Sequence, residues 1–195
     1  MMKRRMKKLN NDGYSLVEMI IVIAIIAVMT AAAVITVNTI QTAKAKEASM
    51  SFESAVKDLH STTKGKAYDF DGDGDVNDVD DQNLSFGLRI YDDGSKCYIQ
   101  KVIVKNGVYE PDATYEKDNN LNKGKGTSLS SYVYVTYSPI GGAEKKIDDS
   151  SYEALIYYGK DGTCKLGVGT YKFYRDNGSS IATVNVNKNG SVISK

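Results

Sequence analysis

Residues 13–37 read GYSLVEMIIVIAIIAVMTAAAVITV, an apolar run that one carboxylate, Glu18, interrupts near its start. The stretch from Leu16 to Val37 is long enough for a helix to span a hydrocarbon core of about 30 Å. Five basic side chains within residues 3–8 precede it, and the positive-inside rule then places the amino terminus in the cytoplasm. We therefore expect a single-pass precursor in the inner or cytoplasmic membrane, with the rest of the chain outside.

The break between the basic leader and the apolar run lies at Gly13. A secretory signal peptide has its small-residue cleavage site after the apolar segment, and no Ala-x-Ala site closes the run here. Cleavage at Gly13 would instead leave the apolar helix on the mature protein.

Gly13, Tyr14 and Glu18, at this spacing after a basic leader, resemble the class III leader of type IV prepilins and type II secretion pseudopilins. In that family a prepilin peptidase cuts after the glycine and methylates the new amino terminus. The family usually has Phe after the glycine, where this chain has Tyr14. The resemblance covers residues 1–60 and implies a leader at 1–13, a pilin helix at 14–60 with a transmembrane segment at 16–37, and a globular head at 61–195.

Glu18 is the one acidic side chain in the apolar run. A carboxylate inside a bilayer costs about 2.5 to 3.5 kcal/mol and tends to find a partner. The first basic residue after Tyr14 is Lys44, far out of reach along a helix that rises about 1.5 Å per residue. The resemblance implies that the partner is the methylated amine of Tyr14 in a neighbouring subunit. A glutamate tolerated near the membrane interface of an ordinary anchor is the alternative.

The resemblance implies a structural subunit that an assembly platform adds to a homo-oligomeric, extracellular pilus through its apolar helix. A minor pilin, or a pseudopilin in a periplasmic or cell-wall-spanning pseudopilus, is one alternative. A calcium-stabilised surface binding module on a membrane anchor is another. We expect no enzyme, because the sequence has no visible nucleophile with its base, paired carboxylates in a cleft, or phosphate loop.

Removing residues 1–13 takes away five of the 25 basic and one of the 24 acidic side chains, which leaves a net charge of −3. This balance argues against a nucleic-acid-binding surface.

Beyond the apolar run, apolar residues recur at spacings of three and four and predict that the helix continues with one buried face. These residues are Ala48, Phe52, Ala55, Val56 and Leu59. No proline occurs before Pro111, so nothing predicts a kink. His60, the single histidine, falls at the expected helix end, where we predict a capping or solvent-facing role.

Residues 69–80 read DFDGDGDVNDVD and resemble a twelve-residue calcium loop of the kind found in dockerins and bacterial extracellular proteins. The predicted ligands are Asp69, Asp71, Asp73, Asp75 through its backbone carbonyl, Asn77 and the closing Asp80, with Gly74 at the turn. We expect a structural Ca²⁺ bound with an affinity of about 10⁻⁴ to 10⁻³ M. A solvated acidic surface loop is the alternative.

From Leu84 onward, short alternating runs rich in Tyr, Val and Ile predict strands and an α+β fold, with the long helix packed on one antiparallel sheet in a meander. The expected strands are 85–91, 97–104, 131–137, 152–158, 166–174 and 181–187, with a last one near Val192. Hairpin signals lie at 92–94, 160–162, 176–178 and 189–190. The polar stretch 106–130 is expected to be an exposed loop.

The chain has two cysteines, Cys97 and Cys164, on predicted strands or their edges. Both lie in the part expected outside the membrane, where an oxidising environment favours a disulfide between them. Two buried free thiols are the alternative.

Overall fold

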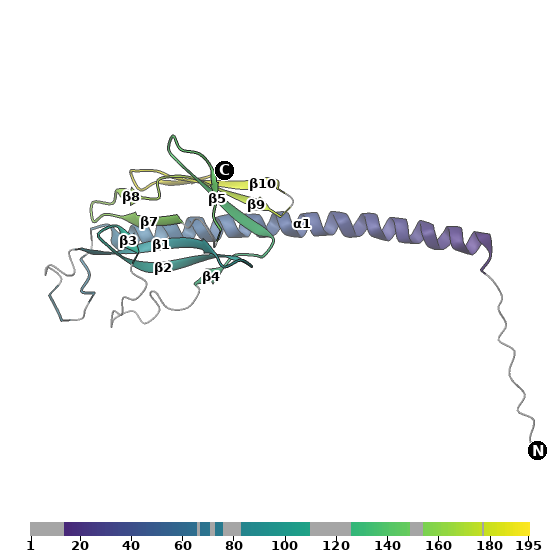
Figure 1. Ribbon diagram of the computed structural model, residues 1–195, viewed down its shortest axis with the longest axis horizontal. Coiled ribbons are helices and arrows are strands. Elements are labelled where there is room, and N and C mark those ends of the chain that lie inside the picture. Colours follow the sequence, from purple (N-terminus) through teal and green to yellow (C-terminus); the bar gives the residue numbers. More distant parts are fainter. Residues whose placement is uncertain are drawn as a thin grey trace, which may run out of the picture. The chain divides into compact units, whose positions relative to one another are not determined.

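The computed structural model describes residues 14–65, 67–70, 73–75, 83–109, 126–148, 154–176 and 178–195 (Figure 1). It consists of one helix followed by strands. The elements are α1 (Leu16–Thr63), β1 (Leu84–Asp92), β2 (Cys97–Lys105), β3 (Val108–Tyr109), β4 (Thr127–Ser128), β5 (Val133–Pro139), β6 (Lys145–Lys146), β7 (Ala154–Tyr158), β8 (Cys164–Leu166), β9 (Gly169–Arg175), β10 (Ser180–Val186) and β11 (Val192–Ser194).

The chain divides into two compact units, Met1–Thr39 and Ile40–Lys195, and α1 contributes to both. The helix is continuous from Leu16 to Thr63, as expected for a segment without proline. It begins two residues later and ends three residues later than the predicted range 14–60.

In the second unit, α1 buries one stripe of side chains at spacings of three and four, which confirms the predicted amphipathic half. Of the predicted residues, Ala48, Phe52, Val56 and Leu59 are buried, and Ala55 is half-buried against the same core. The Phe52 ring lies 4.8 Å from the Tyr171 ring in β9, measured between centroids. Since β9 alternates buried and half-buried residues, its apolar face and this stripe form one core.

The strands form two antiparallel sheets, where we predicted one. The first has the order β3-β2-β1-β7-β8, with β4 also paired to β2. The second has the order β11-β10-β9-β5-β6. In it β5 pairs with β9 and β6, whereas β4, which precedes β5 in the chain, belongs to the first sheet (Figure 1). The α+β class is confirmed, and the single meander is wrong.

The predicted strand 166–174 is two strands, because the chain passes from one sheet to the other at Gly167 and Val168. Gly167 has φ +84° and a β-carbon there would lie 2.6 Å from Ile156, so only glycine fits. Three side chains donate hydrogen bonds of 2.9 Å to successive carbonyls of this passage. These bonds run from Cys164 Sγ to Leu166, from Tyr171 Oη to Gly167 and from Tyr137 Oη to Val168.

The four predicted hairpin turns all connect paired antiparallel strands, namely β1–β2, β7–β8, β9–β10 and β10–β11. In the first, the Asp92 carboxylate accepts a hydrogen bond of 2.8 Å from the Gly94 amide, the local bond that favours aspartate in turns. The predicted loop 106–130 contains two short strands, β3 and β4, and its residues 110–125 lie outside the described part of the chain.

Candidate functional site

The described chain begins at Tyr14, directly after the predicted cleavage site, and Gly13 lies outside it. Tyr14 and Ser15 precede the first residue of α1, Leu16. The Ser15 hydroxyl oxygen accepts a hydrogen bond of 3.2 Å from the Glu18 amide, and the Glu18 carboxylate accepts one of 2.9 Å from the Ser15 amide. This reciprocal pair is a capping box, with Ser15 as N-cap and Glu18 at the third helical position.

The capping box changes what the sequence indicated about Glu18. We expected its carboxylate to find a partner in another molecule or to be tolerated near the membrane interface, and the structure provides a hydrogen bond from its own chain. That donor is a neutral amide, so the bond orients the carboxylate but does not pair it with a positive charge. Ser15 was missed by the sequence analysis, although the spacing Ser-x-x-Glu before an apolar run is the known signature of a capping box.

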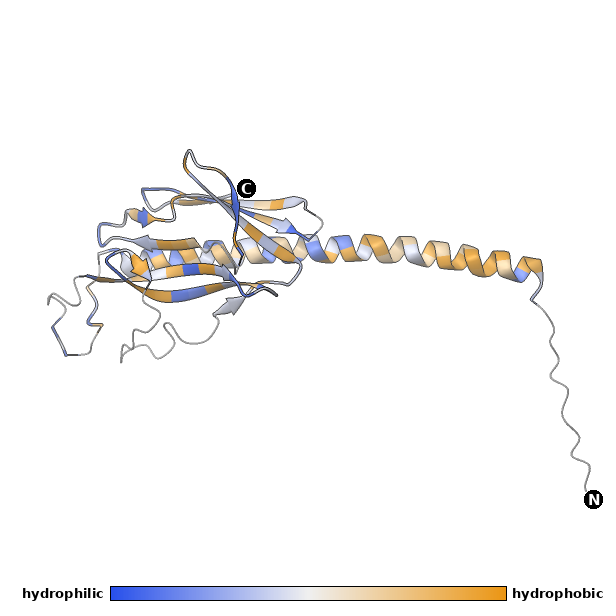
Figure 2. Ribbon diagram, viewed as in Figure 1, coloured by the Kyte–Doolittle hydropathy of each residue, from blue (hydrophilic) through white to orange (hydrophobic). Residues whose placement is uncertain are grey.

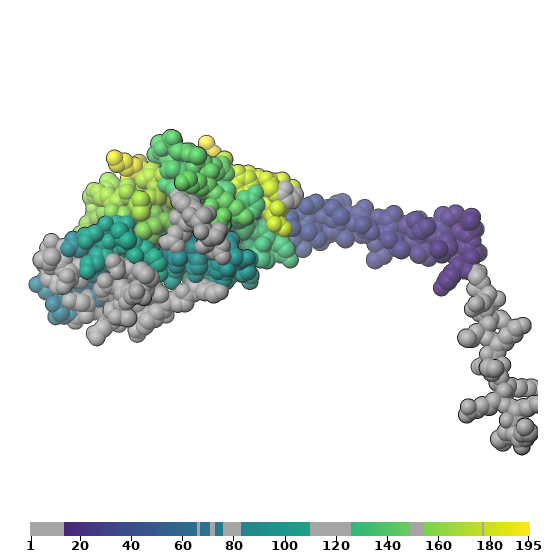
Figure 3. Space-filling view, in the orientation of Figure 1, coloured from purple at the N-terminus to yellow at the C-terminus, as the bar shows by residue number. Residues whose placement is uncertain are grey.

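The first half of α1 presents apolar side chains on all its faces. Every residue from 14 to 39 is exposed. Figure 3 shows this stretch from one side, and its hydropathy colouring is predominantly apolar (Figure 2). By length and composition the helix is able to cross a membrane, with a mean hydropathy of 3.0 over its most apolar 18 residues. An exposed surface of this kind requires lipid or other apolar partners.

Three threonines in this half satisfy their hydroxyl groups within the helix. Thr30, Thr36 and Thr39 donate hydrogen bonds of 2.8 to 3.0 Å to the carbonyls four residues earlier. Because a polar group without a partner is costly in hydrocarbon, these internal bonds suit the segment to an apolar environment.

The predicted calcium loop is described only in part. Asp69, Asp73 and Asp75 lie in the described chain, whereas Asp71, Asn77 and Asp80 lie outside it. The Asp69 carboxylate accepts a hydrogen bond of 3.1 Å from the Gly74 amide, and the Asp73 carboxylate accepts one of 2.7 Å from the Asp75 amide. Within the described residues, no three His, Cys, Asp or Glu side chains are gathered as metal ligands would be.

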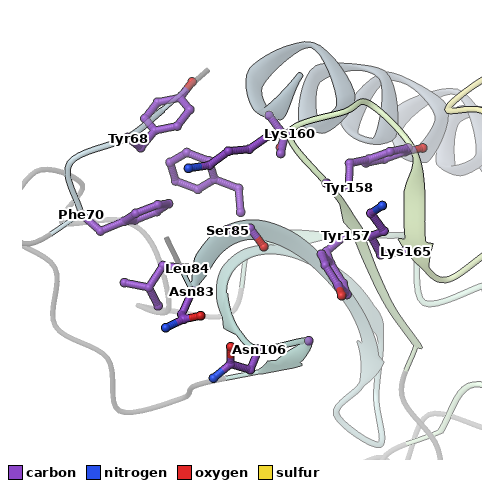
Figure 4. Close-up of a pocket in the computed structure, with 14 residues that line it drawn as sticks. Tyr68, Phe70, Asn83, Leu84, Ser85, Asn106, Tyr157, Tyr158, Lys160 and Lys165 are labelled. Carbon is purple, nitrogen blue, oxygen red and sulfur yellow. The ribbon is translucent and has the colours of Figure 1, made fainter. Parts of the chain in front are cut away.

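An aromatic cluster holds the start of this loop on the first sheet. The Phe86 ring of β1 lies 5.0 Å from the Phe70 ring and 4.6 Å from the Tyr68 ring, between centroids. These rings border a cavity of about 560 Å³, whose other side includes Tyr157 and Lys160 (Figure 4). Because the rings pack on one another, the cluster acts first as an anchor for the segment that leads into the acidic loop.

The predicted disulfide is wrong. Cys97 and Cys164 are both free and buried. Cys97 begins β2 and Cys164 begins β8, and the sheet order β2-β1-β7-β8 puts three strand spacings, about 14 Å, between their strands. A disulfide needs the two α-carbons within about 7 Å, so these cysteines are too far apart. Burial raises the pKa of Cys97 to about 12 and that of Cys164 to about 11, so both thiols stay protonated at neutral pH.

His60 makes a tertiary contact, where we predicted that it caps the end of the helix or faces solvent. Its Nε2 lies 3.0 Å from the carbonyl oxygen of Gly162 in the β7–β8 turn, and its ring packs 4.9 Å from that of Tyr158. The side chain therefore ties the last turn of α1 to the first sheet.

Comparison with known proteins gives one match. Residues 8–34 match the family model described as the prokaryotic N-terminal methylation motif. No curated protein and no solved structure matches the chain. The motif is the prepilin-type leader of type IV pilins and pseudopilins, and it implies processing by prepilin peptidase and assembly with other pilins. It indicates a structural subunit rather than an enzyme. The motif and the exposed apolar helix, whose first part it includes, thus support a type IV pilin-like or pseudopilin protein, made as a membrane-anchored precursor.

Proposed function

We propose that this chain is a structural subunit of a type IV pilus filament, cleaved after Gly13 and methylated on Tyr14. The observation that carries the proposal is the methylation motif at residues 8–34, which runs into the apolar half of α1, together with the exposure of every residue from 14 to 39. An ordinary membrane anchor explains the apolar helix but gives no reason for the motif at its start.

Burial of the apolar helix stabilises the assembled filament against release of subunits into water in this proposal. Each large apolar side chain that leaves water contributes about 1.5 to 3 kcal/mol. Leu16, Val17, Ile20 and Ile23 are each more than half exposed, as are most of the large apolar side chains that follow them. A single subunit outside the membrane would expose this whole surface, so it would either return to lipid or pack against the helices of other subunits.

Glu18 gives the assembly its register in this proposal. Its carboxylate lies in the first turn of α1, close to where cleavage after Gly13 would create a new amine on Tyr14. The amine of one subunit and the carboxylate of the next would neutralise each other in an apolar surrounding, where opposite charges attract strongly. Neither charge would then remain unpaired in the filament core.

The test is mass spectrometry of the amino-terminal peptide from the membrane-extracted wild-type protein. We expect a chain that starts at Tyr14 and carries one added methyl group, and a Gly13→Ala variant that keeps residues 1–13. An Asn11→Ala variant in the same leader serves as the matched control and should be cleaved normally. Full retention of the leader in the wild-type protein would refute the proposal.

Electron microscopy with an antibody against the head then separates a major subunit from the alternatives. Labelling along the whole length of a filament supports the major subunit. Labelling confined to a tip or to a short fibre would instead favour a minor pilin or a pseudopilin.

The same proposal includes a structural Ca²⁺ in the loop 69–80. Besides the spacing of its acidic residues, Gly74 supports it, because φ is +98° at the sixth position, where the loop signature needs glycine for a sharp turn. A bound cation would also relieve the repulsion among the crowded carboxylates.

Calorimetry on a soluble fragment that begins at Ile40 tests the metal. With a Kd of about 10⁻³ M, 10 mM Ca²⁺ should stabilise the fragment by about 1.4 kcal/mol. An Asp73→Asn variant should lose most of this effect. If the wild-type fragment takes up no Ca²⁺ at millimolar concentration, the loop is only an acidic surface turn.

A further inference from the structure

The start of α1 is defined by one side chain. Ser15 is the residue before the first helical position, and its hydroxyl oxygen and amide exchange two hydrogen bonds with Glu18. The helix therefore begins two residues after the peptide bond between Gly13 and Tyr14. The backbone amides of the first turn, which have no partner inside a helix, are thereby partly satisfied at Ser15 and Glu18.

We infer that Ser15 is a positioning residue for leader cleavage, and this inference rests on the proposed function. By capping the helix at this point, Ser15 makes Leu16 the first helical residue, so Tyr14, whose amide belongs to the scissile bond, precedes the helical turn. Peptidases cut chain segments that lie outside regular structure, so a bond inside a helical turn is a poor substrate. The hydroxyl thus acts on the reaction through the backbone, without contact with the reacting atoms.

The sequence explains what happens without this cap. Asp12 is a good N-cap residue type three positions earlier than Ser15. If Ser15 is replaced by alanine, a helix capped at Asp12 would place Gly13 and Tyr14 at its first and second positions. This longer helix would be favoured near a membrane, because amides without partners are costly in an apolar surrounding. The scissile bond would then lie within the first helical turn.

The two bonds of the capping box have separable roles. The bond from the Glu18 amide to the Ser15 hydroxyl uses only the backbone of residue 18, and it survives any ordinary substitution of Glu18. The bond from the Ser15 amide to the Glu18 carboxylate holds that carboxylate at the helix start before assembly. Cleavage should therefore depend mainly on Ser15. The placement of the Glu18 carboxylate should depend on both residues.

The experiment uses the full-length precursor in detergent micelles with purified prepilin peptidase. Loss of an N-cap shifts the helix equilibrium by about fivefold, equivalent to ~1 kcal/mol. We expect kcat/KM for cleavage to fall by up to that factor in Ser15→Ala and to return in Ser15→Thr, whose hydroxyl also caps. Thr30→Ala, which removes a hydroxyl from the same apolar helix away from its start, is the matched control and should cleave normally.

A second measurement reports the helix start without reference to activity. The ¹³Cα chemical shifts of Gly13 and Tyr14 in the uncleaved precursors should move toward helical values in Ser15→Ala alone. Unchanged shifts and unchanged kcat/KM in that variant would overturn the inference while leaving the proposed function intact. A wild-type precursor that the peptidase does not cleave would instead mean that the proposed function fails.

Discussion

Replacing Phe52 by alanine tests how the helix is held in the head. Phe52 is 1% exposed and is the largest side chain on the buried stripe of α1. Its ring packs 4.8 Å from Tyr171 and 5.6 Å from Phe173, between centroids, so it inserts into the apolar face of the second sheet. The substitution would leave a cavity between a helix and two aromatic rings.

The expected loss in the free energy of unfolding is about 4 kcal/mol. Substitutions of buried Phe by Ala cost about 3 to 5 kcal/mol, as the sum of lost transfer free energy and the cavity that remains. Tyr171 is itself fixed, because its hydroxyl donates to the Gly167 carbonyl and because Tyr137, which stacks on it, donates to the Val168 carbonyl. The walls of the cavity therefore have little freedom to collapse, which places the cost in the middle of this range or above it.

Urea unfolding of a fragment that begins at Ile40 measures this loss, followed by circular dichroism because the chain has no tryptophan. Met50→Ala on the same helix is the control, since Met50 is 61% exposed and should change stability by less than about 0.5 kcal/mol. A loss below about 1.5 kcal/mol for Phe52→Ala, with an unchanged m-value, would refute the reasoning that this ring anchors the helix.

Two further predictions concern titratable groups. Cys97 and Cys164 should not react with a thiol reagent at pH 8 until the protein unfolds, and a reductant should leave the melting temperature unchanged; rapid labelling of the native protein would contradict the burial of both thiols. Hydrogen bonds from Lys172 and two hydroxyls lower the pKa of Glu144 from 4.5 to about 2, so the stabilisation is present above pH 4.5 and is lost as the pH falls toward 2. Because the Glu144 side chain is a third exposed, we expect Glu144→Gln to lower the free energy of unfolding by about 1 kcal/mol at pH 7 and by almost nothing at pH 2. Glu47→Gln, at an exposed position, is the control. A difference between variant and wild type that stays the same from pH 7 to pH 2 would show that the carboxylate contributes no pH-dependent stability.

The start of α1 shows that a local signal can be present and still be missed. Ser15 and Glu18 are three residues apart, and their hydrogen bonds need no distant part of the chain. The cost of a carboxylate in a membrane predicts a partner in another molecule and says nothing of local hydrogen bonds. The Ser-x-x-Glu spacing before the apolar run does predict the capping box.

Local patterns in the chain are sufficient to predict the membrane anchor, the long helix, its buried stripe and the four hairpin turns. Each depends on residues within one or two helical turns, or on a few neighbouring residues such as Asp92 and Gly94, so local composition and spacing are sufficient. The division of the strands between two sheets, the separation of Cys97 from Cys164 and the rings that Phe52 contacts follow from the folded arrangement and not from local pattern. These features depend on pairings such as Val133 with Arg175, residues far apart in the chain, and many alternating strands could form such pairs equally well by local pattern. The choice among them comes from packing every apolar face into one core at the same time.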